Sequence, residues 1–287
     1  MNLFYAPGVT AGLYTLDDEE SRHCKMVLRL SEGAVIHMTD GLGNLYESRI
    51  VDSKSKRITV EITGKQEAYG RMAGYVHIAV APTKNIDRME WFLEKSTEIG
   101  IDEITPLVCD HSERRQLRSE RLEKVITAAM KQSYKAYRPK LNELTDFNKF
   151  IARDHPEGRF IAHLEGENPI LLKRAYKKDS HSVILIGPEG DFSQQELKLA
   201  SEHGFQCVSL GDCRLRTETA ALVACHTIRL LNQELSLPLF RPEISYRYQH
   251  LFQRDPAMLK GVPVIIHIVI VIVGIGKEII SPAEYER

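Results

Sequence analysis

The sequence lacks the signatures of several common protein classes. Its five cysteines include no CxxC pair, and their spacing matches no zinc site. No metal site is predicted, and we expect free thiols, which are typical of the reducing cytosol. The first ten residues, MNLFYAPGVT, lack the basic and apolar regions of a signal peptide. We therefore expect a cytoplasmic protein.

The chain also has little excess charge and few long apolar runs. Its formal net charge is −1, so any nucleic-acid binding requires a local basic patch. The longest apolar run, 262–276 (VPVIIHIVIVIVGIG), is shorter than the roughly 20 residues that a membrane-spanning helix needs. A buried strand or an appended segment is favoured over a membrane anchor, and we expect no membrane association.

The first seventy residues have the pattern of a small β-domain. Strand-like runs cover 34–40, 45–51 and 57–63, and turn-forming clusters separate them. Two glycines and no clear periodicity mark 66–74 as the boundary of this domain. The sequence therefore predicts a β-rich domain over 1–70.

After this boundary, apolar runs alternate with helical patterns. The predicted strands cover 75–82, 104–108, 159–164, 182–187 and 206–210. Signals for helix starts lie between them: the capping-box pairs Asp87/Glu90 and Ser193/Glu196, then Ser119, and then Thr217 or Thr219. Alternation of this kind predicts an α/β fold with a parallel sheet covered on both faces. We assign this second domain to 74–235 and treat 236–287 as a C-terminal extension of unknown role.

Two unusual loops follow predicted strands. The first is IGPEGDFS at 186–193, where Gly187 and Gly190 would permit close approach of a ligand or unusual backbone angles. The P-loop pattern GxxxxGK[ST] and the dinucleotide-binding pattern GxGxxG are both absent, which weakens the alternative of a nucleotide-binding protein. A plain glycine turn is the other reading of this loop.

The second loop is LGDCRLRTETA at 210–220, which leads into a helix. Glu218 in a first helical turn can simply complement the helix dipole, whereas Arg216 opposes that dipole and needs another explanation. Ligands of open α/β sheets bind beyond the carboxyl ends of the strands. We therefore expect both loops at one binding site.

Together the two loops resemble the ribosomal RNA small subunit methyltransferase E family of the SPOUT superfamily. Further segments resemble the same family: HCKMVLRL at 23–30, EKSTEIG at 94–100 with Lys84 and Arg88 before it, and ITP at 104–106. The QS pair at 132–133 and the RP pair at 138–139 match as well. The resemblance covers about 1–235. One departure is Asp191, where many relatives have glycine.

The resemblance implies a PUA-like N-terminal domain and a trefoil-knotted methyltransferase domain that forms a homodimer. It also implies S-adenosylmethionine as cofactor and the small ribosomal subunit as partner, with 3-methyluridine in 16S rRNA as product. The cofactor would lie in the knot, formed by loops after three neighbouring strands. The residues that the resemblance assigns to cofactor binding are Leu164, Glu165, Gly166, Ile186, Gly187, Pro188, Glu189, Gly190, Leu210, Gly211, Leu215, Arg216 and Thr219.

The chemistry suggests roles for two further side chains. Uridine N3 carries a proton at neutral pH, so its methylation needs a base, or a cation that stabilises the anion. We expect Arg216 to hold a uracil oxygen or a phosphate. Glu218 would orient Arg216 or take part in proton removal. A purely structural Arg216–Glu218 ion pair is the alternative.

Basic residues outside the two loops are candidates for RNA binding. Each of them could also lie on an ordinary solvated surface, and His23 could make a structural hydrogen bond. The candidates are Arg22, His23, Lys25, Arg29, Lys84, Arg88, Arg114, Arg115 and Arg138.

Two alternatives stay open for the whole chain. A SPOUT methyltransferase could act on another RNA nucleotide, and a catalytically silent homologue could bind RNA during ribosome assembly.

Overall fold

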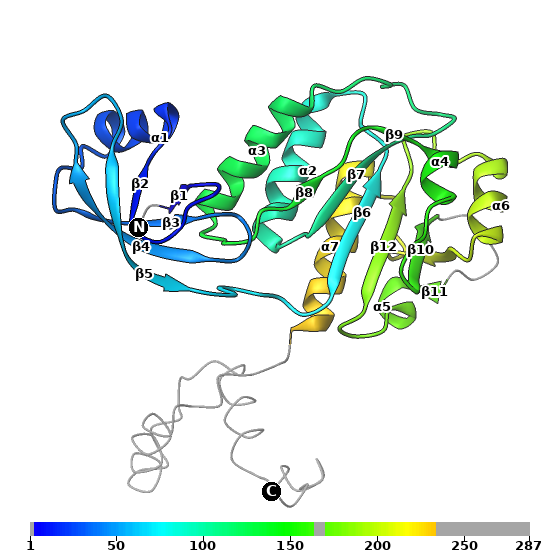
Figure 1. Cartoon of the computed structure of the whole chain (residues 1–287). Helices are drawn as coiled ribbons and strands as arrows, with labels where there is room; N and C mark the ends of the chain where they lie inside the picture. The colour runs from blue at the N-terminus through cyan, green and yellow to red at the C-terminus, as the bar shows by residue number, and fades with distance from the viewer. Residues whose placement is uncertain (1–2, 164–169, 234–287) are drawn as a thin grey trace, which may run out of the picture. The chain divides into compact units, whose positions relative to one another are not determined.

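The computed structural model describes residues 3–163 and 170–233, which contain two β-sheets (Figure 1). The predicted cofactor residues Leu164, Glu165 and Gly166 lie outside these ranges, as does the extension at 236–287 with its apolar run. Within the described residues, no helix is both long and apolar enough to cross a bilayer.

The first sheet has five strands in the order β1-β3-β4-β5-β2. Their bounds are β1 Leu3–Tyr5, β2 Leu13–Thr15, β3 Val35–Thr39, β4 Leu45–Asp52 and β5 Thr59–Gln66. The three predicted strands are confirmed as β3, β4 and β5. The three-residue strands β1 and β2 were not predicted, and β1 pairs in parallel with β3. A short helix α1 (Asp18–Arg22) and a π-helical turn η1 (His23–Val27) follow β2.

The second sheet is parallel and has the strand order β11-β13-β10-β12-β6-β7-β8, with β9 paired to β7. Its elements are β6 Tyr75–Val80, β7 Glu103–Val108, β8 Lys140–Leu141, β9 Thr145–Asp146, β10 Gly158–Ala162, β11 Ile170–Leu171, β12 His181–Ile186 and β13 Gln206–Ser209. The predicted α/β class and parallel sheet are confirmed. The loops that follow β10, β12 and β13 therefore begin at one edge, because parallel neighbours end on the same side.

Helices cover both faces of this sheet, as predicted (Figure 1). One face packs against α2 (Ile86–Ile99), α3 (Ser119–Gln132), α5 (Leu172–Ala175) and α7 (Thr217–Asn232), and the other against α4 (Phe147–Ile151) and α6 (Gln194–Glu202). Side chains alternate along each strand. Ile78 and Val80 thus belong to the first core, while Ala79 belongs to the second.

The helix starts were predicted with mixed success. Ser193 and Glu196 form the expected capping box of α6. The pair Asp87/Glu90 does not cap α2, because Asn85 is the N-cap and its side chain accepts from the Asp87 amide. Ser119 is the first residue of α3 and not its cap. These shifts of one or two residues arise because several neighbouring polar side chains compete for one capping position.

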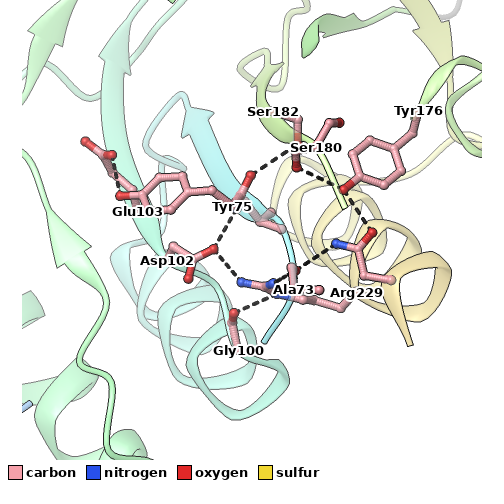
Figure 2. A network of polar contacts seen from close by, with 11 residues as sticks. Ala73, Tyr75, Gly100, Asp102, Glu103, Tyr176, Ser180, Ser182 and Arg229 are labelled. Atoms are coloured by element: carbon pink, nitrogen blue, oxygen red, sulfur yellow. Dashed lines mark hydrogen bonds and ion pairs between the residues drawn. The ribbon is translucent and has the colours of Figure 1, made fainter. Parts of the chain in front are cut away.

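Arg229 joins the C-terminal end of α7 to the segments that precede β6 and β7 (Figure 2). Its guanidinium donates to the carbonyl oxygens of Gly100 at 2.8 Å and Ala73 at 2.9 Å, and it pairs with the Asp102 carboxylate. Asp102 also accepts from the Val76 amide at 2.6 Å. Only 2% of the Arg229 side chain is exposed, so this network satisfies a buried charge.

The first sheet contacts the segment that ends α3. Lys131 on α3 pairs with Glu20 on α1 at 2.6 Å, and both side chains are largely buried. The Gly43 amide donates to the Ala136 carbonyl oxygen at 2.9 Å. The described residues accordingly form one compact unit. The division into domains at 1–70 and 74–235 stays a prediction.

Candidate functional site

A pocket lies at the carboxyl ends of β10, β12 and β13. These strands are adjacent and parallel, with β10 between the other two. The pocket is open to solvent and contains about 650 Å³ of empty space. The position agrees with the rule for open α/β sheets.

The loop after β12 forms one wall of this pocket. The Glu189 carboxylate accepts from the Lys84 amide at 3.0 Å and so joins the loop to the segment after β6. Neither Gly187 nor Gly190 has a positive φ, so neither uses the unusual backbone angles that glycine permits. Both are tightly packed instead: an added Cβ would lie 3.1 Å from Phe192 at Gly187 and 3.1 Å from His111 at Gly190.

Asp191 joins this loop to the end of β10. Its φ is +63°, in the left-handed region that glycine adopts most readily, which explains why glycine suits the position. Its carboxylate lies 3.0 Å from Nδ1 of His163, whose side chain is only 5% exposed. Asp191 is thus half-exposed and also holds His163, the residue that follows β10.

The loop after β13 and the start of α7 form the opposite wall. The Ser209 hydroxyl lies 3.1 Å from the Gly211 amide that donates to it, and Gly211 has a φ of +133°. Thr217, the first residue of α7, donates its hydroxyl hydrogen to the Gly187 carbonyl oxygen at 3.0 Å. Arg216 makes no side-chain capping hydrogen bond at this helix start. The two predicted loops are thus directly joined.

Most of the described residues predicted to bind a cofactor line this pocket. These are Ile186, Gly187, Pro188, Glu189, Leu210, Gly211 and Leu215. Three others, Gly190, Arg216 and Thr219, do not line it.

The pocket also contains residues that were not among the predicted cofactor-binding positions. They flank the predicted positions on the same strands and loops, so the strand ends themselves were the available signal. They are Ala162, His163, Asp191, Val208, Ser209, Cys213, Arg214, Thr217 and Ala220.

Arg216 and Glu218 lie at a second hollow, together with Thr219 and three residues of the α2 segment, Asp87, Arg88 and Trp91. Glu218 faces Arg88, whose Nε lies 3.9 Å from Oε1. The Glu218 side chain is 9% exposed, and its Oε2 has no hydrogen-bond partner among the described residues. The alternative of an Arg216–Glu218 ion pair was therefore wrong, because Arg88 occupies the position opposite Glu218.

Several predicted RNA-binding residues have partners within the fold. Lys84 pairs with Glu113 at 2.8 Å, and this hydrogen bond raises the pKa of Lys84. Arg114 donates to the carbonyl oxygens of Thr83 and Lys84 at 3.1 and 2.7 Å. Arg115 donates to the Asp110 carbonyl oxygen at 3.1 Å. These contacts brace the segments near the pocket.

The others divide into bound and exposed side chains. Arg138 donates to Thr127 at 3.0 Å and pairs with Glu123, so most of its donors are used. Lys25 donates to the Ser55 carbonyl oxygen, and the His23 ring packs 5.9 Å from that of Phe4. Among the basic candidates between residues 22 and 29, Arg22 and Arg29 are exposed, whereas His23 and Lys25 are partly buried.

Comparisons with known proteins place the chain in a family. The model of an RNA methyltransferase domain matches residues 72–229, and that of an RNA methyltransferase PUA domain matches 16–63. A Rickettsia conorii protein named ribosomal RNA small subunit methyltransferase E is 28% identical over 217 residues, covering 75% of this chain and 88% of its own. The chain belongs to the ribosomal RNA small subunit methyltransferase E family.

Two solved structures support this assignment at the level of the fold. The crystal structure of a probable rRNA-methyltransferase from Porphyromonas gingivalis is 40% identical with a TM-score of 0.76, covering 81% of this chain and 100% of that one. A ribosomal RNA small subunit methyltransferase E from Neisseria gonorrhoeae, bound to S-adenosylmethionine, is 27% identical with a TM-score of 0.71 and covers 80% and 98%. The fold is therefore of the SPOUT type with a PUA-like N-terminal domain. The knot stays a prediction, because it would include 164–169.

Proposed function

We propose that the protein transfers a methyl group from S-adenosylmethionine to N3 of a uridine in the 16S rRNA of the small ribosomal subunit. The observation that carries this proposal is the pocket itself. The chain is an RNA methyltransferase, and its pocket lies where the loops after β10, β12 and β13 meet. The Thr217–Gly187 and His163–Asp191 contacts hold these loops together. The names of the relatives support the choice of RNA, and the Neisseria structure supports the choice of cofactor.

The lining of the pocket suits S-adenosylmethionine. Its apolar side chains, including Val208, Leu210 and Leu215, provide a surface for adenine. Arg214 and Glu189 supply charges of both signs, which suit the carboxylate and ammonium groups of the methionine part. When bound, the cofactor supplies a methyl group on a sulfonium, and the protein supplies position and surroundings.

The remaining chemistry falls to the chain's own residues. N3 of uridine attacks the methyl carbon, the carbon–sulfur bond breaks and the N3 proton must leave. We assign uptake of this proton to Glu218, a buried carboxylate with one oxygen unpartnered. Arg216, which is exposed at the same hollow, would hold a uracil oxygen as negative charge develops on the ring. Arg88 positions Glu218 from the opposite side.

The RNA must present an unpaired uridine to these residues. A base inside folded RNA reaches such a site only after it is splayed out of its stack. Exposed basic residues such as Arg22 and Arg29 would contact the phosphates, and the PUA-like domain would bind RNA next to the target. We further propose a homodimer that acts in the cytoplasm, where small subunits are assembled and where the five free cysteines are stable.

Cofactor binding can be tested by calorimetric titration with S-adenosylmethionine and S-adenosylhomocysteine. We expect affinity near 1 μM, equivalent to about −8 kcal/mol. Ala220→Leu would fill the pocket and weaken binding at least about tenfold, because the added side chain occupies ligand space. The matched control, Ala128→Leu on the exposed side of α3, should bind as the native protein does.

Transfer can be tested with isotope-labelled methyl groups and small subunits that lack the modification. We expect label in 16S rRNA and none in large subunits. Cofactor binding without transfer to any ribosomal particle would contradict the proposal and favour a silent assembly factor. Label in another RNA would favour a different substrate.

A further inference from the structure

The second hollow, between α2 and the first turn of α7, has the composition of a nucleobase site. It contains about 630 Å³ of empty space open to solvent. Thr217 and Ala220 of α7 line the first pocket, whereas Arg216, Glu218 and Thr219 line this hollow. The first turn of α7 therefore contributes to both pockets, and only the first pocket lies at the strand ends.

Glu218 is the strongest sign that this hollow takes a ligand. The residue is 7% exposed, yet its Oε2 has no hydrogen-bond partner among the described residues. The nearest cation, on Arg88, reaches only Oε1 and lies at 3.9 Å. A buried carboxylate oxygen without a donor is costly, so such an atom calls for an N–H or O–H group from a bound molecule.

Trp91 provides an aromatic surface at the same hollow. It is the only tryptophan of the chain, and it is 41% exposed although it lies on a helix that packs against the sheet. Bases of unpaired RNA stack on such side chains, and arginines beside them contact phosphates or base oxygens. Arg88 and Arg216 supply these cations here.

We propose that this hollow binds an unpaired RNA base that carries a ring N–H on its pairing edge, stacked on Trp91 and donating to Oε2 of Glu218. The base is uracil in the proposed substrate, and this identification rests on the proposed function. Uracil presents N3–H between two carbonyl oxygens. Glu218 supplies an acceptor at the hollow and Arg88 and Arg216 supply donors, while the other carboxylate, Asp87, lies 3.7 Å from the guanidinium of Arg121. Cytosine and adenine have an acceptor at the corresponding ring nitrogen and would face the carboxylate with an unfavourable contact.

The single tryptophan makes the proposal measurable. Uridine 5′-monophosphate and cytidine 5′-monophosphate are titrated at millimolar concentrations, with excitation at the red edge of tryptophan absorption where nucleotides do not absorb. We expect saturable quenching of Trp91 by the uridine nucleotide and at least about tenfold weaker binding of the cytidine nucleotide, because a site built around one hydrogen bond rejects ligands that lack it. Equal quenching by both nucleotides, or none by either, would overturn the proposal.

Glu218→Gln separates base recognition from folding. This variant keeps Trp91 as reporter but removes the carboxylate, so we expect the preference for the uridine nucleotide to fall to nearly equal binding. Glu94→Gln on the same helix α2 is the control, since Glu94 lies outside the hollow, and it should keep the preference. Calorimetry with S-adenosylmethionine at the first pocket shows whether each variant is folded. A folded Glu218→Gln protein with an unchanged preference would contradict the role of Glu218.

Failure of this inference can be told apart from failure of the proposed function. Methyl transfer to 16S rRNA together with equal quenching by the two nucleotides would contradict the nucleobase site but leave the proposed function intact. Preference for the uridine nucleotide without any methyl transfer would contradict the proposed function but leave the nucleobase site intact. If acrylamide reaches Trp91 only in dilute protein, a second copy covers the hollow, and the nucleobase site would be overturned in favour of a protein interface.

Discussion

The hydroxyl of Thr217 donates to the carbonyl oxygen of Gly187 at 3.0 Å, and this bond joins the first residue of α7 to the loop after β12. Both residues line the proposed cofactor pocket. The contact therefore fixes two pocket walls that are thirty positions apart in the sequence. Its loss should loosen the pocket without removing any part of the core.

Thr217→Val tests this contact. The substitution keeps the side-chain shape and removes one hydrogen bond, worth about 1 kcal/mol, so we expect S-adenosylmethionine to bind about fivefold more weakly. Thr63→Val in β5 is the control, because Thr63 makes a similar bond to the Glu47 carbonyl oxygen at 3.1 Å in the first sheet. Calorimetry measures both. Equal affinities for the two variants would contradict the bracing role of Thr217.

Asp191 should distinguish a backbone effect from a side-chain effect. Both Asp191→Gly and Asp191→Ala remove the contact with His163, but only alanine must be forced into the left-handed conformation. We expect the alanine variant to have a free energy of unfolding about 1 kcal/mol lower than that of the glycine variant. Urea denaturation of the two proteins gives this difference directly. A more stable alanine variant would contradict a left-handed backbone at position 191.

The Arg229–Asp102 pair should contribute strongly to stability (Figure 2). Arg229→Met leaves the partly buried Asp102 without its cation, and we expect a loss of about 3–5 kcal/mol in the free energy of unfolding. Adding Asp102→Asn should restore part of this loss, since it removes the uncompensated charge.

Lys198→Met is a matched control for the Arg229 variant. The Lys198–Glu202 pair on α6 is exposed and 4.0 Å long, so its loss should change stability by less than about 1 kcal/mol. Thermal denaturation of the three variants would test the claim. Similar melting temperatures for Arg229→Met and Lys198→Met would contradict it.

His77 predicts how stability changes with pH. Burial lowers its pKa from 6.5 to about 4, while Nε2 stays 2.7 Å from the Thr105 hydroxyl. As pH falls from 6.5 toward 4, His77 becomes protonated in the unfolded chain but stays neutral in the folded chain. The free energy of unfolding therefore decreases by about 3 kcal/mol over this window. Above pH 6.5 this contribution is fully present. His155, whose pKa burial also lowers, adds to the change in the same direction.

His77→Gln keeps a hydrogen-bonding group and removes the titration. We expect its stability to fall less between pH 7 and pH 4.5 than that of the native protein, as measured by urea denaturation at each pH. Parallel losses in the two proteins would show that other groups control acid denaturation.

The sequence was most informative where structure depends on local pattern. β12 and β13 were predicted from apolar runs, and their loops from glycine and proline positions. Parallel strands end at one edge, so the meeting of the two loops followed from the predicted fold alone. The capping box at Ser193 was likewise a local pattern, and it is confirmed.

The sequence was least informative where contacts join distant segments. β1 and β2 are only three residues long, too short for a periodic signal, and they form by pairing with other strands. The pairing of Glu218 with Arg88 depends on how α2 packs against α7, which no spacing in the sequence encodes. Arg138 was predicted to bind RNA, yet it pairs with Glu123 in the fold.

The most direct test of the central claim is the chemical identity of the product. Small subunits lacking the modification are incubated with the protein and S-adenosylmethionine, and the 16S rRNA is digested to nucleosides for chromatography with mass detection. The account predicts one new nucleoside that co-elutes with 3-methyluridine, formed only when the cofactor is present. Methylation on the uracil carbon, on the ribose or on another base would contradict it.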